Sequence, residues 1–182
     1  MKAEKLSLDG LMLIDLKSYK DDRGFFVERF KENIFADLGI KNNFVQDNFS
    51  RSAPRVLRGL HYQADPAQAK LVTCMRGKIL DVAVDIRKNS KTFGQSVQVV
   101  LDGDNPQWLF MPAGFAHGFC VLENETADIF YKVDGYYNPK TEGCIVWNDP
   151  DIKIDWPVRN PLLSPKDQAG LTLKDYLKNP AF

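Results

Sequence analysis

LDVAVDI, at residues 80–86, is the stretch of this chain that decides its fold class. Four large aliphatic residues occupy the even positions, and two aspartates and an alanine fall between them. Because successive side chains of a β-strand point to opposite faces, one face of this segment meets an apolar layer and the other faces a more polar interior. The pattern predicts a strand that lines the inside of a β-barrel.

Similar short runs, bounded by turn residues, recur along the chain. Eleven strands are predicted and only two helices, so the chain is expected to be all-β. The predicted strands span residues 11–18, 25–30, 44–49, 56–63, 71–75, 79–86, 96–101, 107–111, 117–122, 127–133 and 144–147. One predicted helix spans residues 31–38 and stops at Gly39, and the other opens at Ser164 with Pro165 in its first turn.

Three linking segments carry turn residues: DDRG before Phe25, RGK at residues 76–78 and DGDNP at residues 102–106. Glycine, proline, asparagine and aspartate favour tight turns, so each segment is predicted to close a hairpin. A sheet that closes on itself has no exposed edges and leaves a mouth for a ligand. We therefore expect a β-barrel or jelly roll with a few short peripheral helices.

Length and charge exclude several classes of protein. The 182 residues contain no repeat or linker, which predicts one domain spanning residues 1–182. Twenty-four basic residues balance 24 acidic ones, so no nucleic-acid partner is expected. The apolar runs are too short for a membrane helix and the start lacks a signal sequence, which predicts a cytoplasmic protein. Three widely spaced cysteines, Cys74, Cys120 and Cys144, are expected to be buried as apolar packing.

Only two histidines are present, His61 in VLRGLHYQ and His117 in MPAGFAHGF. A lone histidine is by default structural or exposed. The second segment resembles the second conserved motif of cupins, whereas the first cupin motif needs an H-x-H pair and a glutamate. RGLHYQADPAQAKL offers one histidine and no glutamate, and a catalytic metal site usually takes three protein ligands. We therefore predict a cupin-like fold with no metal and no cofactor.

Without a metal, the chemistry depends on side chains. Arg58, His61 and Lys70 lie close together in the sequence, on and after one predicted strand. The two cations suit a phosphate, and a neutral imidazole can take a proton. Ordinary surface charges at Arg58 and Lys70 are the alternative.

Seven motifs, in fixed order, resemble those of dTDP-4-dehydrorhamnose 3,5-epimerases, and the resemblance runs from about Asp21 to Asp167. They are VQDNFS, VLRGLHYQ, KLVTCMRGKILDVAVDIRKNSKTFG, MPAGFAHGF, YKVDGYYNP, IVWNDPDIKIDWP and LSPKD. That family inverts carbons 3 and 5 of a dTDP-linked 4-keto-6-deoxyhexose. Because both carbons are α to the ketone, the reaction needs a base, a group that stabilises the enolate oxygen, and an acid.

The resemblance implies roles for four residues. His61 is the base, Asp167 orients its ring, Lys70 faces the ketone oxygen and Tyr131 is the acid on the opposite face. Spacing alone favours a structural role for two of them. Ser164 followed by Asp167 forms a helix capping box, and a strand tyrosine is more often packing.

The resemblance also implies a substrate-binding set and a partner. The set is Arg23, Glu28, Gln46, Asp47, Asn48, Arg58, Lys70, His117, Glu142 and Lys166. Arg23 and Glu28 belong to an N-terminal strand that the family exchanges between the two subunits of a homodimer. A plain hairpin turn with solvated charges is the alternative for that segment.

Three other functions stay open. An epimerase that inverts only carbon 3 or carbon 5 would use the same residues, and a 4-keto to 3-keto sugar isomerase shares the enolisation. A non-catalytic module that binds a nucleotide sugar would keep the binding residues yet tolerate loss of the base or acid. The complete set of base, acid and orienting carboxylate favours an epimerase.

Overall fold

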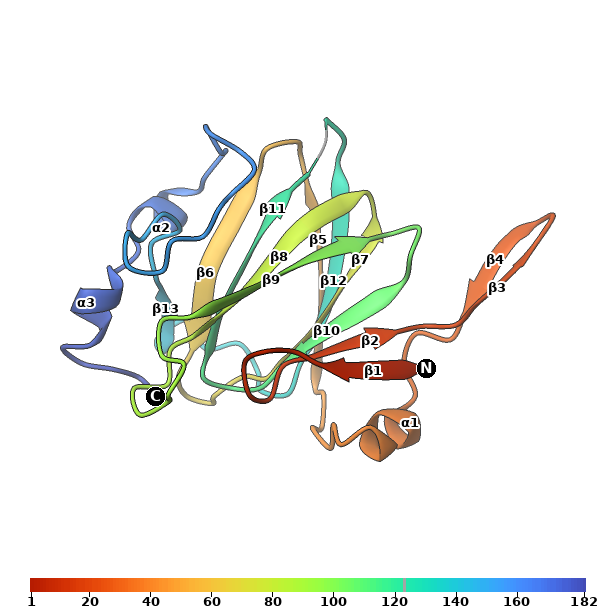
Figure 1. The fold of residues 1–182 in the computed structure, drawn as a ribbon, viewed down its shortest axis with the longest axis horizontal. Coiled ribbons are helices and arrows are strands. Elements are labelled where there is room, and N and C mark those ends of the chain that lie inside the picture. The colour runs from red at the N-terminus through yellow and green to blue at the C-terminus, as the bar shows by residue number, and fades with distance from the viewer. Residues whose placement is uncertain (123) are drawn as a thin grey trace.

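The computed structural model describes residues 1–122 and 124–182. Two β-sheets pack face to face, as expected for a cupin-like jelly roll, and three short helices lie outside them (Figure 1). The strands are β1 (Lys2–Lys5), β2 (Met12–Asp15), β3 (Ser18–Asp21), β4 (Gly24–Val27), β5 (Gln46–Ser52), β6 (Leu57–Gln63), β7 (Lys70–Arg76), β8 (Lys78–Asp85), β9 (Ser96–Asp102), β10 (Gln107–Met111), β11 (Phe115–Val121), β12 (Ala127–Val133) and β13 (Glu142–Cys144). The helices are α1 (Glu32–Asp37), α2 (Pro165–Gln168) and α3 (Leu173–Tyr176).

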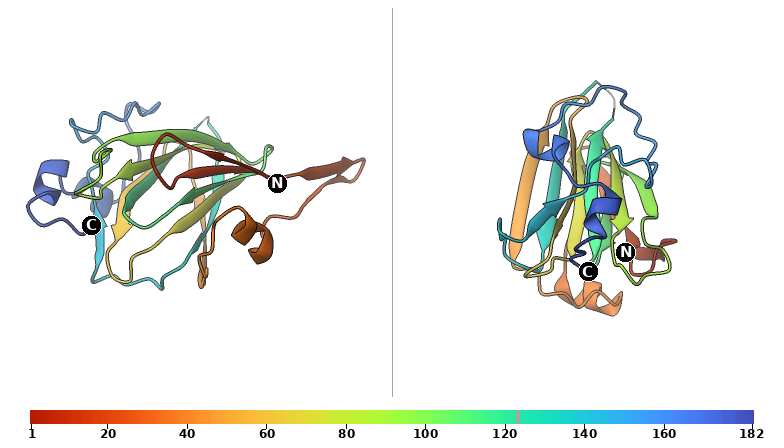
Figure 2. Two further views of the ribbon diagram at one scale, coloured as in Figure 1. Left: turned by 60° about the horizontal axis from the view of Figure 1, so that its bottom comes forward. Right: turned by 90° about the vertical axis from the view of Figure 1, so that its left-hand side faces the viewer.

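One sheet has the strand order β1-β2-β10-β7-β12-β5, and the other has the order β13-β6-β11-β8-β9. The remaining pair, β3 and β4, forms a hairpin that projects away from the barrel (Figures 1 and 2). The helix α1 lies against the six-stranded sheet, whereas α2 and α3 lie beside the five-stranded one (Figure 2). None of the helices among the described residues has the length and apolar character needed to cross a membrane.

Three apolar clusters hold these layers together. The central cluster fills the space between the sheets and includes Val72, Ala83 and Phe119. A second cluster joins the outer face of the five-stranded sheet to the C-terminal segment, with Tyr176 fully buried. The third lies under α1 on the outer face of the six-stranded sheet. Burial of a large apolar side chain stabilises the fold by about 1.5–3 kcal/mol, so each cluster anchors its layer.

Most of the predicted strands are confirmed. The predicted strand at residues 144–147 is wrong, because β13 pairs with β6 only through Glu142–Cys144 and shares just Cys144 with the predicted segment. The segment 11–18 is not one strand but divides into β2 and the first residue of β3. The strand β1 and the helix α3 were not predicted, because KAEK is almost entirely polar and LKDY is a single helical turn. Short elements of this kind carry too few residues to show a periodicity.

The hairpin prediction is correct for DDRG, which joins β3 to β4, and wrong for the other two segments. RGK joins β7 to β8, and DGDNP joins β9 to β10, but the two strands of each pair lie in different sheets. Both turns therefore carry the chain across the sandwich instead of back along one sheet. Turn residues indicate a change of direction but do not indicate which strand becomes the neighbour.

Candidate active site

His61 lies on the inner face of β6, where it is paired in the strand ladder with His117 of β11. Gly59 makes this arrangement possible, because its φ is +119° and a Cβ there would lie 2.5 Å from the Cα of Gly118. The two glycines let the strands approach at the irregularity that separates His61 from Arg58. The sequence RGLH therefore places a cation and an imidazole on the same side of one strand.

The ring of His61 is held by Asp167. Its Nε2 lies 2.7 Å from the Asp167 Oδ1 atom, and the side chain keeps 27% of its surface exposed. An ionised carboxylate only accepts hydrogen bonds, so Nε2 carries the hydrogen and Nδ1 keeps the lone pair in the neutral ring. This arrangement suits Nδ1 to take a proton from a ligand.

Asp167 belongs to the capping box of α2 and is also the partner of His61, so the two roles expected for it are compatible. Its Oδ2 accepts hydrogen bonds from the backbone and hydroxyl of Ser164, which complete the capping box of α2. Its Oδ1 accepts from His61 and from the amide of Gly59 at 3.0 Å. Burial alone would raise the pKa of this carboxyl, but the hydrogen bonds outweigh it and hold the pKa well below its usual range.

Lys70 enters the site from β7 in the opposite sheet. Its Nζ donates a hydrogen bond to the carbonyl oxygen of His61 at 3.2 Å. The side chain is buried, and the loss of hydration lowers its pKa to about 8, although the negative charges of Glu142 and Asp81 oppose the shift. The site therefore holds a cation close to the backbone of the histidine.

Tyr131 also comes from the six-stranded sheet, on β12, and packs against the central cluster. Burial raises the pKa of its phenol, and the charge of Glu142 adds to the effect. The hydroxyl therefore stays protonated at neutral pH. His61 and Tyr131 consequently face one interior from opposite sheets.

The predicted residues of β5 divide between two faces. Tyr131 pairs with Asn48 in the ladder, and the Gln46 amide donates to the Asn48 Oδ1 atom at 2.9 Å, so these three share the inner face. Asp47 points the other way and accepts a hydrogen bond from Lys132 at 2.6 Å. The structure therefore does not bring Asp47 together with the other predicted residues.

Charged residues of the predicted binding set line the same mouth. The Arg58 Nε atom donates to the Ser52 hydroxyl at 3.1 Å. Glu142 of β13 forms an ion pair with Lys166 of α2, and it accepts a hydrogen bond from the Tyr137 hydroxyl at 2.9 Å. Burial alone would raise the pKa of Glu142, but these two partners outweigh it and lower the pKa below its ordinary value.

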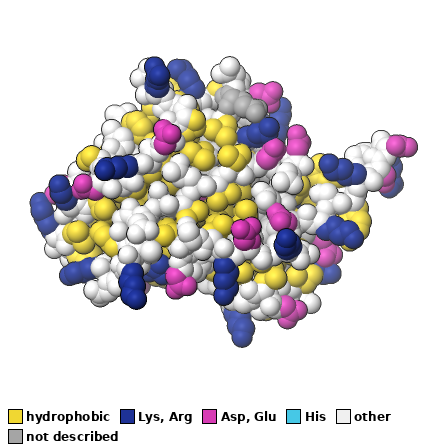
Figure 3. Space-filling view, viewed as in Figure 1, with side chains coloured by type: hydrophobic (Ala, Val, Ile, Leu, Met, Phe, Trp, Pro, Cys, Tyr) yellow, Lys and Arg dark blue, Asp and Glu magenta, His cyan; other side chains and the backbone are white. Residues whose placement is uncertain are grey.

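Arg23 and Glu28 lie far from this mouth, on and just after the β3–β4 hairpin. The hairpin stands away from the body of the molecule, and charged side chains gather at its tip (Figure 3). Arg23 pairs with Asp21 at 2.6 Å, and Glu28 pairs with Lys31 at 3.1 Å. Within one chain these two residues do not join the other predicted residues.

His61, Asp167 and Cys144 form the one group of three potential metal ligands found among residues 1–122 and 124–182. The 2.7 Å between the ligand atoms of His61 and Asp167 is shorter than the roughly 3.3 Å between two ligands of a tetrahedral zinc with bonds of about 2.0 Å. Burial raises the pKa of the Cys144 thiol to about 11, which favours the uncharged form. The geometry therefore fits a hydrogen-bonded pair with a thiol behind it.

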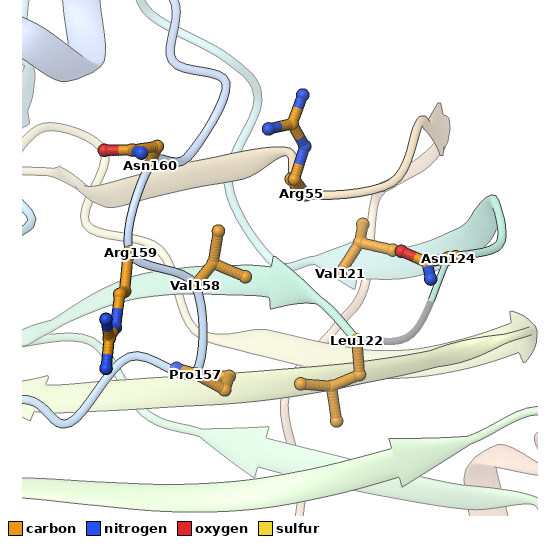
Figure 4. A pocket seen from close by; sticks show the side chains of 8 residues that line it. All are labelled: Arg55, Val121, Leu122, Asn124, Pro157, Val158, Arg159 and Asn160. Atoms are coloured by element: carbon orange, nitrogen blue, oxygen red, sulfur yellow. The ribbon is translucent and has the colours of Figure 1, made fainter.

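A hollow of about 380 Å³ lies elsewhere, between β11 and the segment around Pro157 (Figure 4). Its lining includes Arg55, Val121 and Arg159 but none of the predicted site residues. The two arginine side chains point away from each other (Figure 4). The candidate site is therefore identified by its convergent polar groups and not by this hollow.

Two residues of the site were missed from the sequence. Asp81 contacts His117, and its alternating position in LDVAVDI had already placed it on the inner face. Tyr137 contacts Glu142 and lies in a loop, where no periodicity reveals the direction of a side chain.

Comparisons with known proteins identify the family of this chain. The family model described as dTDP-4-dehydrorhamnose 3,5-epimerase matches residues 5–175. A dTDP-4-dehydrorhamnose 3,5-epimerase from Pseudomonas aeruginosa is 49% identical over 177 residues, which cover 96% of this chain and 97% of the relative. The crystal structure of a dTDP-6-deoxy-D-glucose-3,5-epimerase from Legionella pneumophila, in complex with dTDP-4-keto-L-rhamnose, matches with a TM-score of 0.92 and 48% identity, covering 95% of this chain and 93% of that one.

One more distant relative is named as an epimerase of carbon 3 alone. The dTDP-4-dehydrorhamnose 3-epimerase of Streptomyces niveus is 37% identical over 177 residues, covering 96% of this chain and 85% of the relative. Identity and coverage of the relative are higher for the Pseudomonas 3,5-epimerase than for this 3-epimerase. The chain belongs to the dTDP-4-dehydrorhamnose 3,5-epimerase family.

Proposed function

We propose that residues 1–182 form one epimerase domain that inverts carbons 3 and 5 of dTDP-4-dehydro-6-deoxy-D-glucose. The product is dTDP-4-dehydro-L-rhamnose, an intermediate in dTDP-L-rhamnose biosynthesis. One observation carries the proposal: His61 on one sheet, paired with Asp167 of α2, faces Lys70 and Tyr131 on the other sheet. Inversion of a carbon next to a ketone needs a base that removes the proton from one face, a cation that stabilises the enolate, and an acid that returns a proton to the other face.

The reaction begins at the lone pair of His61 Nδ1. That atom takes the proton from the carbon next to the ketone, and the electron pair of the C–H bond moves to the ketone oxygen as an enolate. Asp167 stabilises the imidazolium that results, and the Lys70 ammonium stabilises the enolate oxygen. Tyr131 then donates its hydroxyl proton to the opposite face of the same carbon, which inverts the centre.

No metal or cofactor takes part in this proposal. A C–H bond next to a ketone is acidified by the ketone itself, and a fixed cation in a buried site stabilises the developing negative charge strongly. Lys70 is such a cation, because it is buried and its Nζ is fixed by a hydrogen bond. His61 and Tyr131 therefore carry the two proton transfers at each carbon, and Lys70 and Asp167 stabilise the charges that form.

A second copy of the chain completes the nucleotide site in this proposal. The β3–β4 hairpin exposes Tyr19, Phe25 and Phe26, an unusual amount of aromatic surface for a free hairpin. If the hairpin of each subunit packs against its partner, these rings become buried and Arg23 and Glu28 reach the partner's site. The protein is thus proposed to be a homodimer with an exchanged N-terminal strand. Its proposed location is the cytoplasm.

An epimerase of a single carbon is the second candidate, because a relative 37% identical carries the name of a 3-epimerase. The same base and acid serve one carbon or two. What separates the two functions is therefore the number of carbons that exchange and not the identity of the side chains.

Proton NMR in deuterated buffer tests the proposed function. Purified, metal-chelated protein is mixed with dTDP-4-keto-6-deoxyglucose, and deuterium is followed at carbons 3 and 5 before the product is trapped by reduction. Exchange at both carbons with a rhamno-configured product supports the 3,5-epimerase. Exchange at one carbon assigns the single epimerase, and intact dTDP binding without exchange contradicts both.

A further inference from the structure

Asp81 is a buried charge that the proposed reaction does not use. It lies on β8, between β11 and β9 in the five-stranded sheet, and is fully buried. Both of its carboxylate oxygens lie 3.0 Å from the Nε2 atom of His117. Among the residues that the structure describes, His117 is its one hydrogen-bond partner. A buried carboxylate is costly unless it is paired, so this contact accounts for its presence.

Asp85 of the same strand offers a contrast. It is also fully buried, but it accepts hydrogen bonds from Arg87, Ser90 and Thr92 in the loop that follows. These contacts fix that loop and do not reach a histidine. Asp85 is therefore a structural carboxylate, and Asp81 is a carboxylate directed at a residue of the candidate site.

We propose that Asp81 is a positioning residue of the reaction, which fixes the ring of His117 against the substrate and supplies a negative charge facing Lys70. This inference rests on the proposed function. Because the carboxylate only accepts, Nε2 of His117 carries its hydrogen towards Asp81, and Nδ1 is directed away from it. If the imidazole of His117 is already fixed, it need not reorient when the sugar binds. Hydrogen-bond partners of functional groups commonly act in this way.

The second effect of Asp81 is on charge. Lys70 donates a hydrogen bond to the carbonyl oxygen of His61 on β6, and the charges of Glu142 on β13, Lys166 on α2 and Asp81 on β8 act on it. Burial and the charge of Lys166 lower the pKa of Lys70, whereas Glu142 and Asp81 raise it. Removing the charge of Asp81 should therefore lower the pKa of Lys70 further. The ammonium would then be lost at a lower pH.

The test compares Asp81→Asn with Asp85→Asn. Asparagine keeps the shape of aspartate, and Asp85 matches Asp81 in strand and burial. We expect Asp81→Asn to lower kcat about 10- to 100-fold, the usual effect of losing a group that orients a functional histidine, and to move the alkaline limb of the kcat profile to lower pH. The Kd for dTDP should stay unchanged. Asp85→Asn should lower Tm and leave kcat and the pH profile as in the wild type.

A ¹⁵N NMR spectrum of the imidazoles separates this inference from the proposed function. In the wild type His117 should show the tautomer with the hydrogen on Nε2, and in Asp81→Asn this signature should be lost or mixed, whatever sugar the enzyme accepts. An unchanged tautomer together with a wild-type pH profile in Asp81→Asn would overturn the inference. A wild type that fails to exchange carbons 3 and 5 but shows the expected tautomers would overturn the proposed function alone.

Discussion

The two histidines of this chain form two histidine–aspartate pairs that look alike and differ in how each is held. In both pairs Nε2 lies about 3 Å or less from a carboxylate, and the two histidines lie on neighbouring strands of one sheet. Asp81 also lies on that sheet, whereas Asp167 lies in α2. Asp167 is fixed by four hydrogen bonds and by its place in the cap of α2, whereas Asp81 contacts His117 alone among the described residues. His61 keeps 27% of its side chain exposed and His117 only 9%.

The differences in exposure and in carboxylate partner indicate different roles for the two rings. A base must reach the carbon that loses its proton, and its partner must stay ionised as the imidazolium forms. His61 is the more exposed of the two rings, and its carboxylate partner is held more strongly. The hydrogen bonds to Asp167 keep the pKa of the Asp167 carboxyl well below its usual range. We therefore assign His61–Asp167 as the proton-transferring pair and His117–Asp81 as the positioning pair.

The largest expected effect comes from Asp167→Asn. Asparagine offers an NH₂ group as well as an oxygen, so it no longer fixes the hydrogen on Nε2 of His61 or stabilises the imidazolium. We expect kcat to fall about 10³- to 10⁴-fold, as in other histidine bases that lose their carboxylate. Steady-state kinetics of the variant measures this fall. A loss of less than tenfold would mean that the two pairs do not differ in function.

Lys70→Met tests the role of the Lys70 ammonium. Because the enolate loses its cation, kcat should fall about 10²- to 10³-fold. In the wild type, activity should decline above about pH 8, where Lys70 loses its proton. The wild-type profile and the variant's kcat are measured with the same substrate. A wild-type profile that is flat up to pH 10 would contradict a catalytic ammonium.

The same substitution should stabilise the fold. The pKa of Lys70 falls from 10.5 to about 8 on folding, so burial of the ammonium costs the folded state on the order of 3 kcal/mol below pH 8. This cost fades as the pH rises towards 10.5, because the unfolded chain then also loses the proton. Lys70→Met should therefore raise the free energy of unfolding at pH 7, and urea unfolding at pH 7 and pH 10 should show the gain shrinking.

Tyr131→Phe separates proton removal from proton return. The phenol is needed only for the second step, so product formation should fall more than deuterium exchange, by about 10²-fold for product. Single-turnover NMR measures both rates in one sample. Equal losses in the two rates would show that Tyr131 also assists the step assigned to His61.

The smallest expected effect comes from Ser164→Ala. This change removes the hydroxyl from the cap of α2 but leaves the hydrogen bond between His61 and Asp167. Loss of an N-cap usually costs about 1 kcal/mol, so Tm should drop by a few degrees while kcat changes only severalfold. A fall in kcat as large as that of Asp167→Asn would show that the cap, and not the pair, determines the position of the ring.

Much of the fold and of the site could be predicted from the sequence. The alternation of LDVAVDI placed Asp81 on an inner face, and the motifs around His61 and Asp167 indicated a pair that the structure brings together. Sheet partners could not be predicted, because RGK looks the same whether its strands pair or separate. Asp47 was expected in the site, but the period-two geometry of β5 directs it away from Gln46 and Asn48.

The most direct test of the roles assigned to the two rings measures deuterium incorporation by His61→Asn and His117→Asn side by side. Both variants should bind dTDP, as isothermal titration would show. We expect His61→Asn to incorporate no deuterium at carbon 3 or carbon 5, whereas His117→Asn should incorporate it slowly at the same carbons as the wild type. Incorporation by His61→Asn together with none by His117→Asn would reverse the two roles and contradict His61 as the base.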